Sequence, residues 1–322
     1  MVTPETRRRA QMILLGALAL AVIIVAVTVV VNSLATTRTA GPAQSSPQID
    51  EAREFTFESR KGSRSLVLRL NHRHRNATAA QLGAIVTDNV TVYGGLLAES
   101  YASSRAGYVN LTYHNDSSAF GYRTVQDADD SLSTRGPGSG LVLVPPGAER
   151  RIGWFSLNVN LSSTSREPSS IVVENDTGHS VQYRINRTNN GTLNVTSDVR
   201  DGTGTITGSD TATCDPSRNR VLLDFISGTS FSADCTFNGT EAIDGPYSVT
   251  VVNGDRLVGK YELAYDESLP SPGAPDPCDP SVSRTEPCTA PVVWTANVSV
   301  QFDSSEINVT NRYNVSIYGD PP

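Results

Sequence analysis

Residues 294–302 read WTANVSVQF, a stretch in which apolar side chains at every second position alternate with polar ones. Successive side chains of a β-strand point to opposite faces, so a period of two predicts a strand with one buried face and one face in water. Residues 109–113 (VNLTY) alternate in the same way. This pattern is typical of antiparallel sheets that cover a core with one face.

Shorter stretches with the same pattern recur between residues 107 and 322. Gly, Asn and Pro separate them at intervals that leave no room for crossover helices. We therefore predict a large antiparallel β-sheet or β-sandwich over residues 107–322. The additional predicted strands are residues 157–161, 181–186, 193–196, 220–226, 247–252, 257–265 and 313–318.

Ahead of this β region, in residues 50–106, apolar residues recur with the helical period. Two helices are predicted there, so the fold class is α+β. Thr78 and Gln81 form a candidate capping box before the second helix. The buried face of the first helix, residues 50–72, is predicted to comprise Ala52, Phe55, Ser59, Gly62 and Leu66. That of the second, residues 78–101, is predicted to comprise Leu82, Ile85, Val86, Val92, Tyr93, Leu96 and Leu97.

Residues 12–31 (MILLGALALAVIIVAVTVVV) form an uncharged apolar run of 20 residues. At ~1.5 Å per residue, a helix of this length spans the ~30 Å hydrocarbon core of a bilayer. We predict a basic cytoplasmic leader over residues 1–10, a transmembrane helix over 11–34 and a stalk linker over 35–49. Arg7–Arg9 precede the apolar run, so the positive-inside rule places the rest of the chain outside the cell. A cleaved secretory signal is the alternative.

The charge balance argues against one large class of partners. The whole chain carries −7, and residues 1–38 carry +3, which leaves −10 on the predicted exterior part. Proteins that bind nucleic acid need clustered positive charge, so nucleic acid is not an expected partner, whereas the lipid bilayer is. The chain has 24 arginines but two lysines, and 20 Asp against 13 Glu, a bias that resembles the proteins of halophiles.

The sequence is rich in Asn-x-Ser/Thr sequons, with thirteen where composition alone predicts about 4. A strand face built from Asn, Ser and Thr produces some sequons without any glycan, because positions i and i+2 share a face. We predict extensive N-glycosylation. Asn89 is left out, because it falls within the predicted apolar stripe of its helix. The candidate sites are Asn76, Asn110, Asn115, Asn160, Asn175, Asn186, Asn190, Asn194, Asn238, Asn297, Asn308 and Asn314.

All four cysteines lie in the predicted exterior part, where pairs usually oxidise. Three connectivities are open. We favour the two local pairs, Cys214 with Cys235 and Cys278 with Cys288, because each closes its own segment. The second pair belongs to residues 269–291, which hold seven prolines and are predicted to form a long surface loop. No C-x2-C spacing suggests a zinc site, and no metal or cofactor is expected.

Candidate catalytic motifs lack residues that their chemistry requires. Gly254 to Lys260 resembles a phosphate-binding loop, but Tyr261 replaces the Ser or Thr that would hold magnesium. Residues 247–265 instead predict a β-hairpin around Asn253-Gly254. His72 and His74 lie among arginines and predict a solvated basic cluster. We therefore expect no enzymatic activity.

The leader carries a resemblance to a known family. Arg8-Arg9-Ala10-Gln11, followed at once by the apolar run, resembles the class III signal peptide of archaeal type IV pilin-like proteins. The resemblance implies cleavage between Ala10 and Gln11 by a membrane peptidase. Many members carry Glu at the fifth mature position, where this chain has Leu15. An uncleaved anchor is the alternative.

Together these features predict a single-pass membrane protein with a glycosylated extracellular part and a structural, adhesive or pilus-accessory role. Other pilin-like subunits or surface-layer components are the expected partners. One rival is an anchored extracellular hydrolase, which a cleft with His114 or His179 beside a carboxylate would favour. The other is a ligand-binding module, which exposed aromatic residues around Trp154 or Trp294 would favour.

Overall fold

The computed structural model describes residues 47–104, 107–133, 140–266, 275–279, 287–305 and 307–319. All but Pro47 belong to the second of two compact units, Gln48–Pro322. The predicted leader, the transmembrane helix, most of the stalk and the candidate processing site Ala10–Gln11 lie outside the described residues. Within these ranges, no helix combines the length and the apolar composition that a bilayer span requires.

Two long helices begin the described chain, α2 (Pro47–Arg73) and α3 (Ala79–Ser104). Helix α2 therefore starts inside the segment predicted as stalk. The predicted capping box is present at the start of α3: the Thr78 N–H donates to Gln81 Oε1 at 2.9 Å, and the Gln81 N–H donates to Thr78 Oγ1 at 3.2 Å. These reciprocal bonds satisfy two of the N–H groups that a helix start leaves without partners.

The buried face of α2 follows the prediction over its first turns and then departs from it. Ala52, Phe55 and Ser59 are buried as predicted, but Ser63 and Val67 are buried in the places expected for Gly62 and Leu66. The predicted set repeats every seven residues, which is 3.5 per turn. A straight α-helix drifts by ~20° per heptad from such a repeat. From Phe55 onward the buried positions are instead spaced by four residues, through Ser59, Ser63 and Val67.

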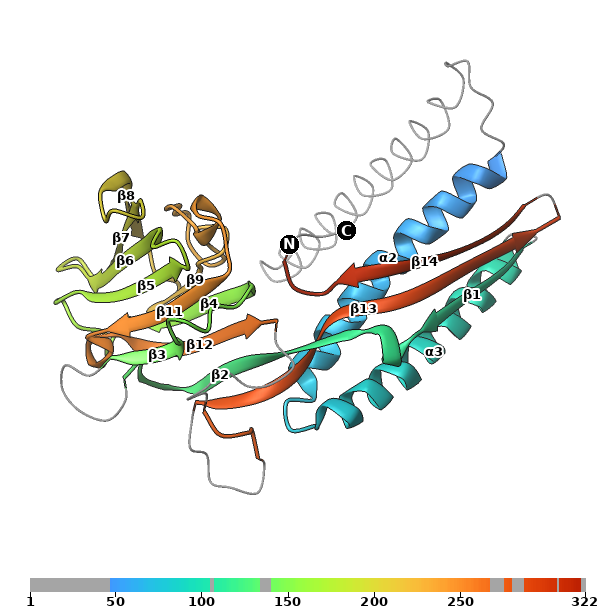
Figure 1. Cartoon of the computed structure of the whole chain (residues 1–322), viewed down its shortest axis with the longest axis horizontal. Helices are drawn as coiled ribbons and strands as arrows, with labels where there is room; N and C mark the ends of the chain where they lie inside the picture. Colours follow the sequence, from blue (N-terminus) through green and yellow to red (C-terminus); the bar gives the residue numbers. More distant parts are fainter. Residues whose placement is uncertain are drawn as a thin grey trace, which may run out of the picture. The chain divides into compact units, whose positions relative to one another are not determined.

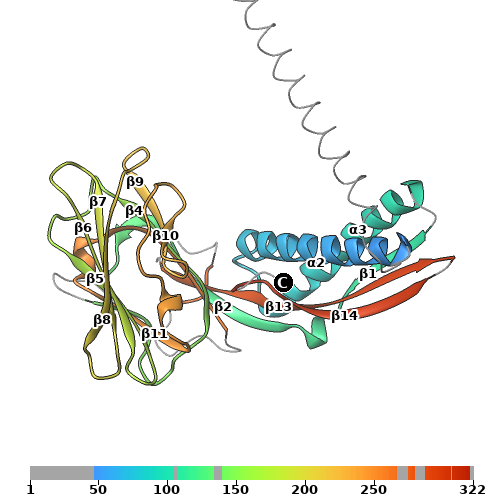
Figure 2. The same ribbon diagram turned by 90° about the horizontal axis from the view of Figure 1, so that it is seen from above.

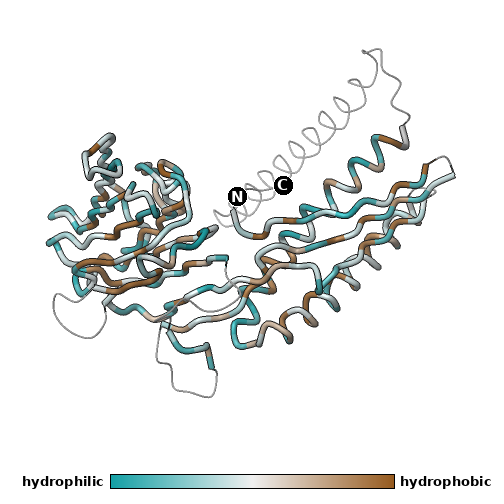
Figure 3. The backbone as a smooth tube through the Cα atoms, in the orientation of Figure 1, coloured by the Kyte–Doolittle hydropathy of each residue, from teal (hydrophilic) through white to brown (hydrophobic). Residues whose placement is uncertain are grey.

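The prediction for α3 was partly wrong. Leu82 and Val86 are buried, but Val92 and Leu96 are 65% and 60% exposed. Figure 3 shows hydrophobic residues along much of α3, so the apolar pattern could not single out one face there. Gly94 lies on the buried face, where a Cβ would lie 3.0 Å from the Leu111 carbonyl oxygen.

The strands form two sheets in which every pairing between named strands is antiparallel. The first has the order β1-β13-β2-β12-β4-β9-β10, with β14 on β13, and the second has the order β3-β11-β5-β6-β7-β8 (Figure 1). The predicted α+β class with a β-sandwich is therefore confirmed at this level. The first sheet contains β1 (Gly107–Tyr113), β2 (Ala119–Ser131), β4 (Ile152–Asn160), β9 (Arg220–Asp224), β10 (Thr229–Ser230), β12 (Val258–Tyr265), β13 (Cys288–Ser304) and β14 (Asn308–Ser316). The second contains β3 (Leu141–Val144), β5 (Ser169–Asn175), β6 (Ser180–Arg187), β7 (Leu193–Arg200), β8 (Ile206–Cys214) and β11 (Tyr247–Val252).

Two hydrophobic cores share the first sheet. One core lies inside the sandwich, and the other lies where α2 and α3 pack on the face formed by β1, β13 and β14 (Figure 2). Strand β12 contributes to both, because Leu263 and Tyr265 point into the sandwich while Ala264 between them packs in the helix core. Both faces are therefore buried at the C-terminal end of this strand, from Leu263 to Tyr265.

The predicted hairpin at Asn253-Gly254 was wrong. Strand β11 pairs with β3 and β5, whereas β12 pairs with β2 and β4, so the connection crosses from one sheet to the other. Asn253 takes the left-handed conformation there. A Cβ on Gly254 would lie 1.7 Å from the Leu132 carbonyl oxygen, so the glycine allows the crossing to pack against the end of β2.

The predicted proline-rich loop was too long at its C-terminal end, because β13 already begins at Cys288. Pro291 lies inside this strand, opposite Tyr122 of β2. Strand β14 pairs with β13 only from Thr295 onward. Pro291 is therefore in a part of β13 where its missing N–H removes no bond to β14.

Candidate functional site

The sequon asparagines separate into three groups by exposure. Asn89 is exposed on α3, and so are its neighbours Val92 and Leu96 of the predicted apolar stripe, so the reason for leaving it out was wrong. The exposed group comprises Asn76, Asn89, Asn115, Asn190, Asn308 and Asn314. The half-buried group comprises Asn110, Asn160, Asn186, Asn194 and Asn238. The buried group comprises Asn175 and Asn297.

The two buried asparagines are held by the fold. Asn175 Oδ1 accepts hydrogen bonds from the N–H groups of Thr177 and His179 at 3.1 and 2.9 Å, and its Nδ2 donates to the Asp244 carbonyl at 2.9 Å. Asn297 Nδ2 donates to Asn314 Oδ1 at 2.6 Å across the β13–β14 pair. A glycan needs the same side-chain nitrogen and room beside it, so the geometry argues against modification at both positions.

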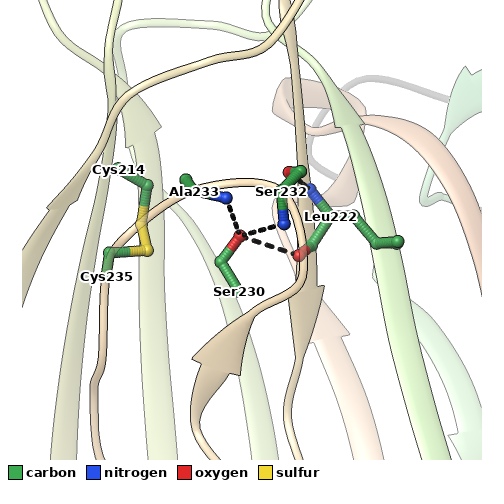
Figure 4. Close-up of a disulfide and its surroundings, with 6 residues drawn as sticks. All are labelled: Cys214, Leu222, Ser230, Ser232, Ala233 and Cys235. Atoms are coloured by element: carbon green, nitrogen blue, oxygen red, sulfur yellow. Dashed lines mark hydrogen bonds between the residues drawn. A yellow bond between two sulfur atoms is a disulfide. The ribbon is translucent and has the colours of Figure 1, made fainter. Parts of the chain in front are cut away.

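The two local disulfides favoured from the sequence are both present, Cys214–Cys235 and Cys278–Cys288. The first joins the end of β8 to the loop after β10 (Figure 4). Ser230 organises the same loop: its Oγ donates to the Leu222 carbonyl at 2.9 Å and accepts from the N–H groups of Ser232 and Ala233 at 3.2 and 3.1 Å.

Phe231 is presented by this loop and is 54% exposed. Its ring stacks on that of Trp154 from β4, with centroids 5.9 Å apart and planes at 19°. The Phe231 N–H donates to the Leu222 carbonyl at 2.9 Å. Trp154 donates its indole N–H to Ser156 Oγ at 3.1 Å, and the His72 ring meets the Trp154 ring in an edge contact at 6.5 Å.

A charged cluster adjoins these rings where α2 ends on the first sheet. His72 Nδ1 lies 3.3 Å from Glu262 Oε2, and Arg123 Nη1 donates to Glu262 Oε1 at 2.9 Å. Arg123 Nη2 also donates to the His72 carbonyl at 3.1 Å. Burial alone would raise the pKa of the Glu262 carboxyl, but the hydrogen bond from His72 and the Arg123 charge outweigh it, so this pKa lies below its usual range.

His72 therefore lies in contact with a carboxylate, whereas the sequence-based expectation concerned His114 and His179. His114 Nε2 lies 2.5 Å from Ser299 Oγ, and His179 Nδ1 lies 2.9 Å from Thr177 Oγ1. The sequence reasoning missed Glu262 because nothing in the local pattern joins residues of α2 and β12. In the parts that the structure describes, no cluster of three or more His, Cys, Asp or Glu has the geometry to hold a metal ion.

The two tryptophans differ in their surroundings. Trp294 is buried and stacks on Tyr318 with ring centroids 5.6 Å apart, so it belongs to the helix core. Trp154 is partly buried and carries the exposed Phe231 ring. Exposed aromatic surface was expected around either residue, and it occurs beside Trp154.

A second surface feature is an apolar groove of about 350 Å³ between the first half of α2 and strand β14. Arg60 closes one side of it, with its guanidinium 4.9 Å from the centre of the Tyr313 ring. Phe57 is more than half exposed here. The lining comprises Ile49, Ala52, Arg53, Thr56, Phe57, Arg60, Ile307, Val309, Asn311 and Tyr313.

Comparisons with protein-family models, with curated proteins and with solved structures give no match. The functional argument therefore rests on the residues of this chain.

Proposed function

We propose that this protein is a membrane-anchored, N-glycosylated extracellular surface protein, similar to pilin-like proteins, with a structural, adhesive or pilus-accessory role. The observation that carries the proposal is the distribution of the sequons: eleven of the thirteen asparagines reach the surface. Two disulfides support the same location, because disulfides persist in oxidising compartments. The apolar run at residues 12–31 supplies the anchor.

The groove beside α2 supports the accessory role. Its lining combines the aliphatic side chains of Ile49, Ile307 and Val309 with the aromatic Phe57. Such a surface suits the insertion of an apolar side chain from a neighbouring pilin-like subunit. The groove lies beside the start of α2, where the chain continues to the predicted stalk and anchor.

Peptide mass spectrometry of protein from native membranes tests the proposal in one experiment. The N-terminal peptide distinguishes a chain that begins at Gln11 from one that retains Arg7–Arg9. A Gln11 start supports the pilus-associated role, and an intact leader leaves a plain anchored surface protein. Recovery of the chain as an unglycosylated cytoplasmic species would refute the proposal.

Glycopeptides from the same digest test its second part. Occupied sites are expected at the exposed Asn76, Asn89, Asn190 and Asn308. Asn175 and Asn297 serve as internal controls, because their side-chain nitrogens are buried and hydrogen-bonded. A map that shows no glycan at any sequon would contradict the proposed glycoprotein.

The ligand-binding module is a second candidate, and a specific observation favours it. Phe231 is an exposed aromatic residue on a loop that a disulfide and a serine hydroxyl hold in place. Its ring partner Trp154 also contacts His72, which lies 3.3 Å from the Glu262 carboxylate.

A further inference from the structure

Phe231 is an exposed apolar residue that is held in place at several points. Its backbone N–H is bonded to Leu222, its ring rests on Trp154, and its loop is closed by Cys214–Cys235. A loop ordered in this way loses little conformational entropy when it meets a ligand. The fold therefore presents one aromatic ring to solvent in a prearranged position, as binding residues require.

The residues that follow Trp154 in this chain of contacts supply polar groups. His72 contacts the edge of Trp154, its side chain is 37% exposed, and it lies within 3.3 Å of Glu262. Glu262, whose side chain is 16% exposed, offers the remaining lone pairs of its carboxylate oxygens, and an imidazole offers a donor or an acceptor. An aromatic surface therefore lies near a few polar groups that can donate hydrogen bonds to hydroxyl groups or accept hydrogen bonds from them.

The mutual neutralisation of Arg123 and Glu262 favours a ligand without charge. Glu262 is already paired with Arg123 and contacted by His72, so this carboxylate is not an isolated charge that attracts a cation. The arginine is likewise neutralised by the carboxylate, which removes the attraction for a phosphate or another anion. The ligand that fits has an apolar face for the ring and several hydroxyl groups for the polar edge.

We propose that Phe231, Trp154, His72 and Glu262 form a binding site for an uncharged saccharide. The C–H face of a pyranose ring packs on Phe231, which Trp154 supports from below. The hydroxyl groups of the sugar meet His72 and the Glu262 carboxylate at the edge of the aromatic surface. A saccharide is then the class of ligand through which the protein would act as an adhesin, so this inference rests on the proposed adhesive role.

The test uses the full-length chain, purified in a detergent without a sugar head group and applied to an array of immobilised neutral glycans. Phe231→Ala should weaken binding about tenfold, which is the value of roughly 1.4 kcal/mol for an aromatic contact. Glu262→Gln should also weaken it, because an NH2 donor replaces one of the two acceptor oxygens of the carboxylate. Tyr108→Ala is the matched control, because Tyr108 is 57% exposed and lies outside the site. It should bind like the unchanged chain.

Thermal unfolding of each variant separates loss of the site from loss of the fold. Phe231→Ala removes an exposed ring and should leave the unfolding temperature almost unchanged. The proposal is overturned if no neutral glycan on the array binds, or if Phe231→Ala binds as tightly as Tyr108→Ala. This result is independent of the N-terminal and glycopeptide maps, so failure of the saccharide site and failure of the surface location are told apart.

Discussion

Replacing Asn71 with alanine should destabilise the protein strongly, because this one side chain bonds both backbone groups of a buried residue. Asn71 is fully buried near the end of α2. Its side-chain amide forms hydrogen bonds with the backbone of β13, as a peptide group of a neighbouring strand would. Its Nδ2 donates to the Val293 carbonyl at 3.0 Å, and its Oδ1 accepts from the Val293 N–H at 3.0 Å. The same Nδ2 lies 3.4 Å from the Tyr318 hydroxyl.

The magnitude follows from the groups left without partners. Val293 is fully buried, so neither its N–H nor its carbonyl can turn to water when the amide is removed. Each buried backbone group without a partner costs about 1–3 kcal/mol. The two groups together give a loss of roughly 4 kcal/mol in the free energy of unfolding, a large part of the ~5–15 kcal/mol that proteins possess.

Urea unfolding followed by tryptophan fluorescence measures this loss, because Trp294 follows Val293 in the same core. Asn311→Ala is the control, since Asn311 is exposed on β14 and its change should stay within about 0.5 kcal/mol. A loss below about 1 kcal/mol for Asn71→Ala, less than one unsatisfied backbone group costs, would show that Val293 finds other partners and would refute the reasoning.

Three further outcomes are expected. Gly95→Ala should stabilise α3 by about 0.5–1 kcal/mol, because a Cβ there meets nothing within 4 Å. Gly94→Ala should destabilise the protein, because its Cβ would approach the Leu111 carbonyl oxygen. Urea unfolding of the two variants compares these effects. Because the pKa of Glu262 is lowered in the folded protein, its stabilising contribution is present above the pKa of an unfolded carboxyl and disappears as the pH falls through the folded value. Below about pH 4.5, the unchanged chain should therefore lose stability more steeply than Glu262→Gln. Asn175→Ala should cost about 2 kcal/mol by thermal or urea unfolding, because the N–H groups in its turn lose their acceptor.

Local patterns in the sequence were sufficient for much of the fold. The capping box of α3, most strand positions and both disulfide pairs depend on residues close together in the chain. The strands that were not predicted lack a clean alternation. In β2, residues 123–126 are buried in succession because both faces of the sheet are covered there, whereas β8 is exposed along most of its length.

Near the N-terminus, the sequence by itself determined the apolar run and the leader motif, and along the rest of the chain it determined the sequons. These features are written in consecutive residues, and no partner in the fold is needed to recognise them. The burial of Asn175 and Asn297 shows the limit of such motifs, because a sequon does not record how its side chain is packed.

Only the tertiary structure decided which face of α3 is buried and which side chains lie together at the end of α2. It also decided that the strands before and after Asn253-Gly254 belong to different sheets. Asn71 and Val293 are separated by 222 positions in the chain, and Arg123 and Glu262 by 139. The period of a segment indicates that it has a buried face, but not what will cover that face. Contacts over such separations arise from the packing of whole elements, and the proposed saccharide site consists entirely of them.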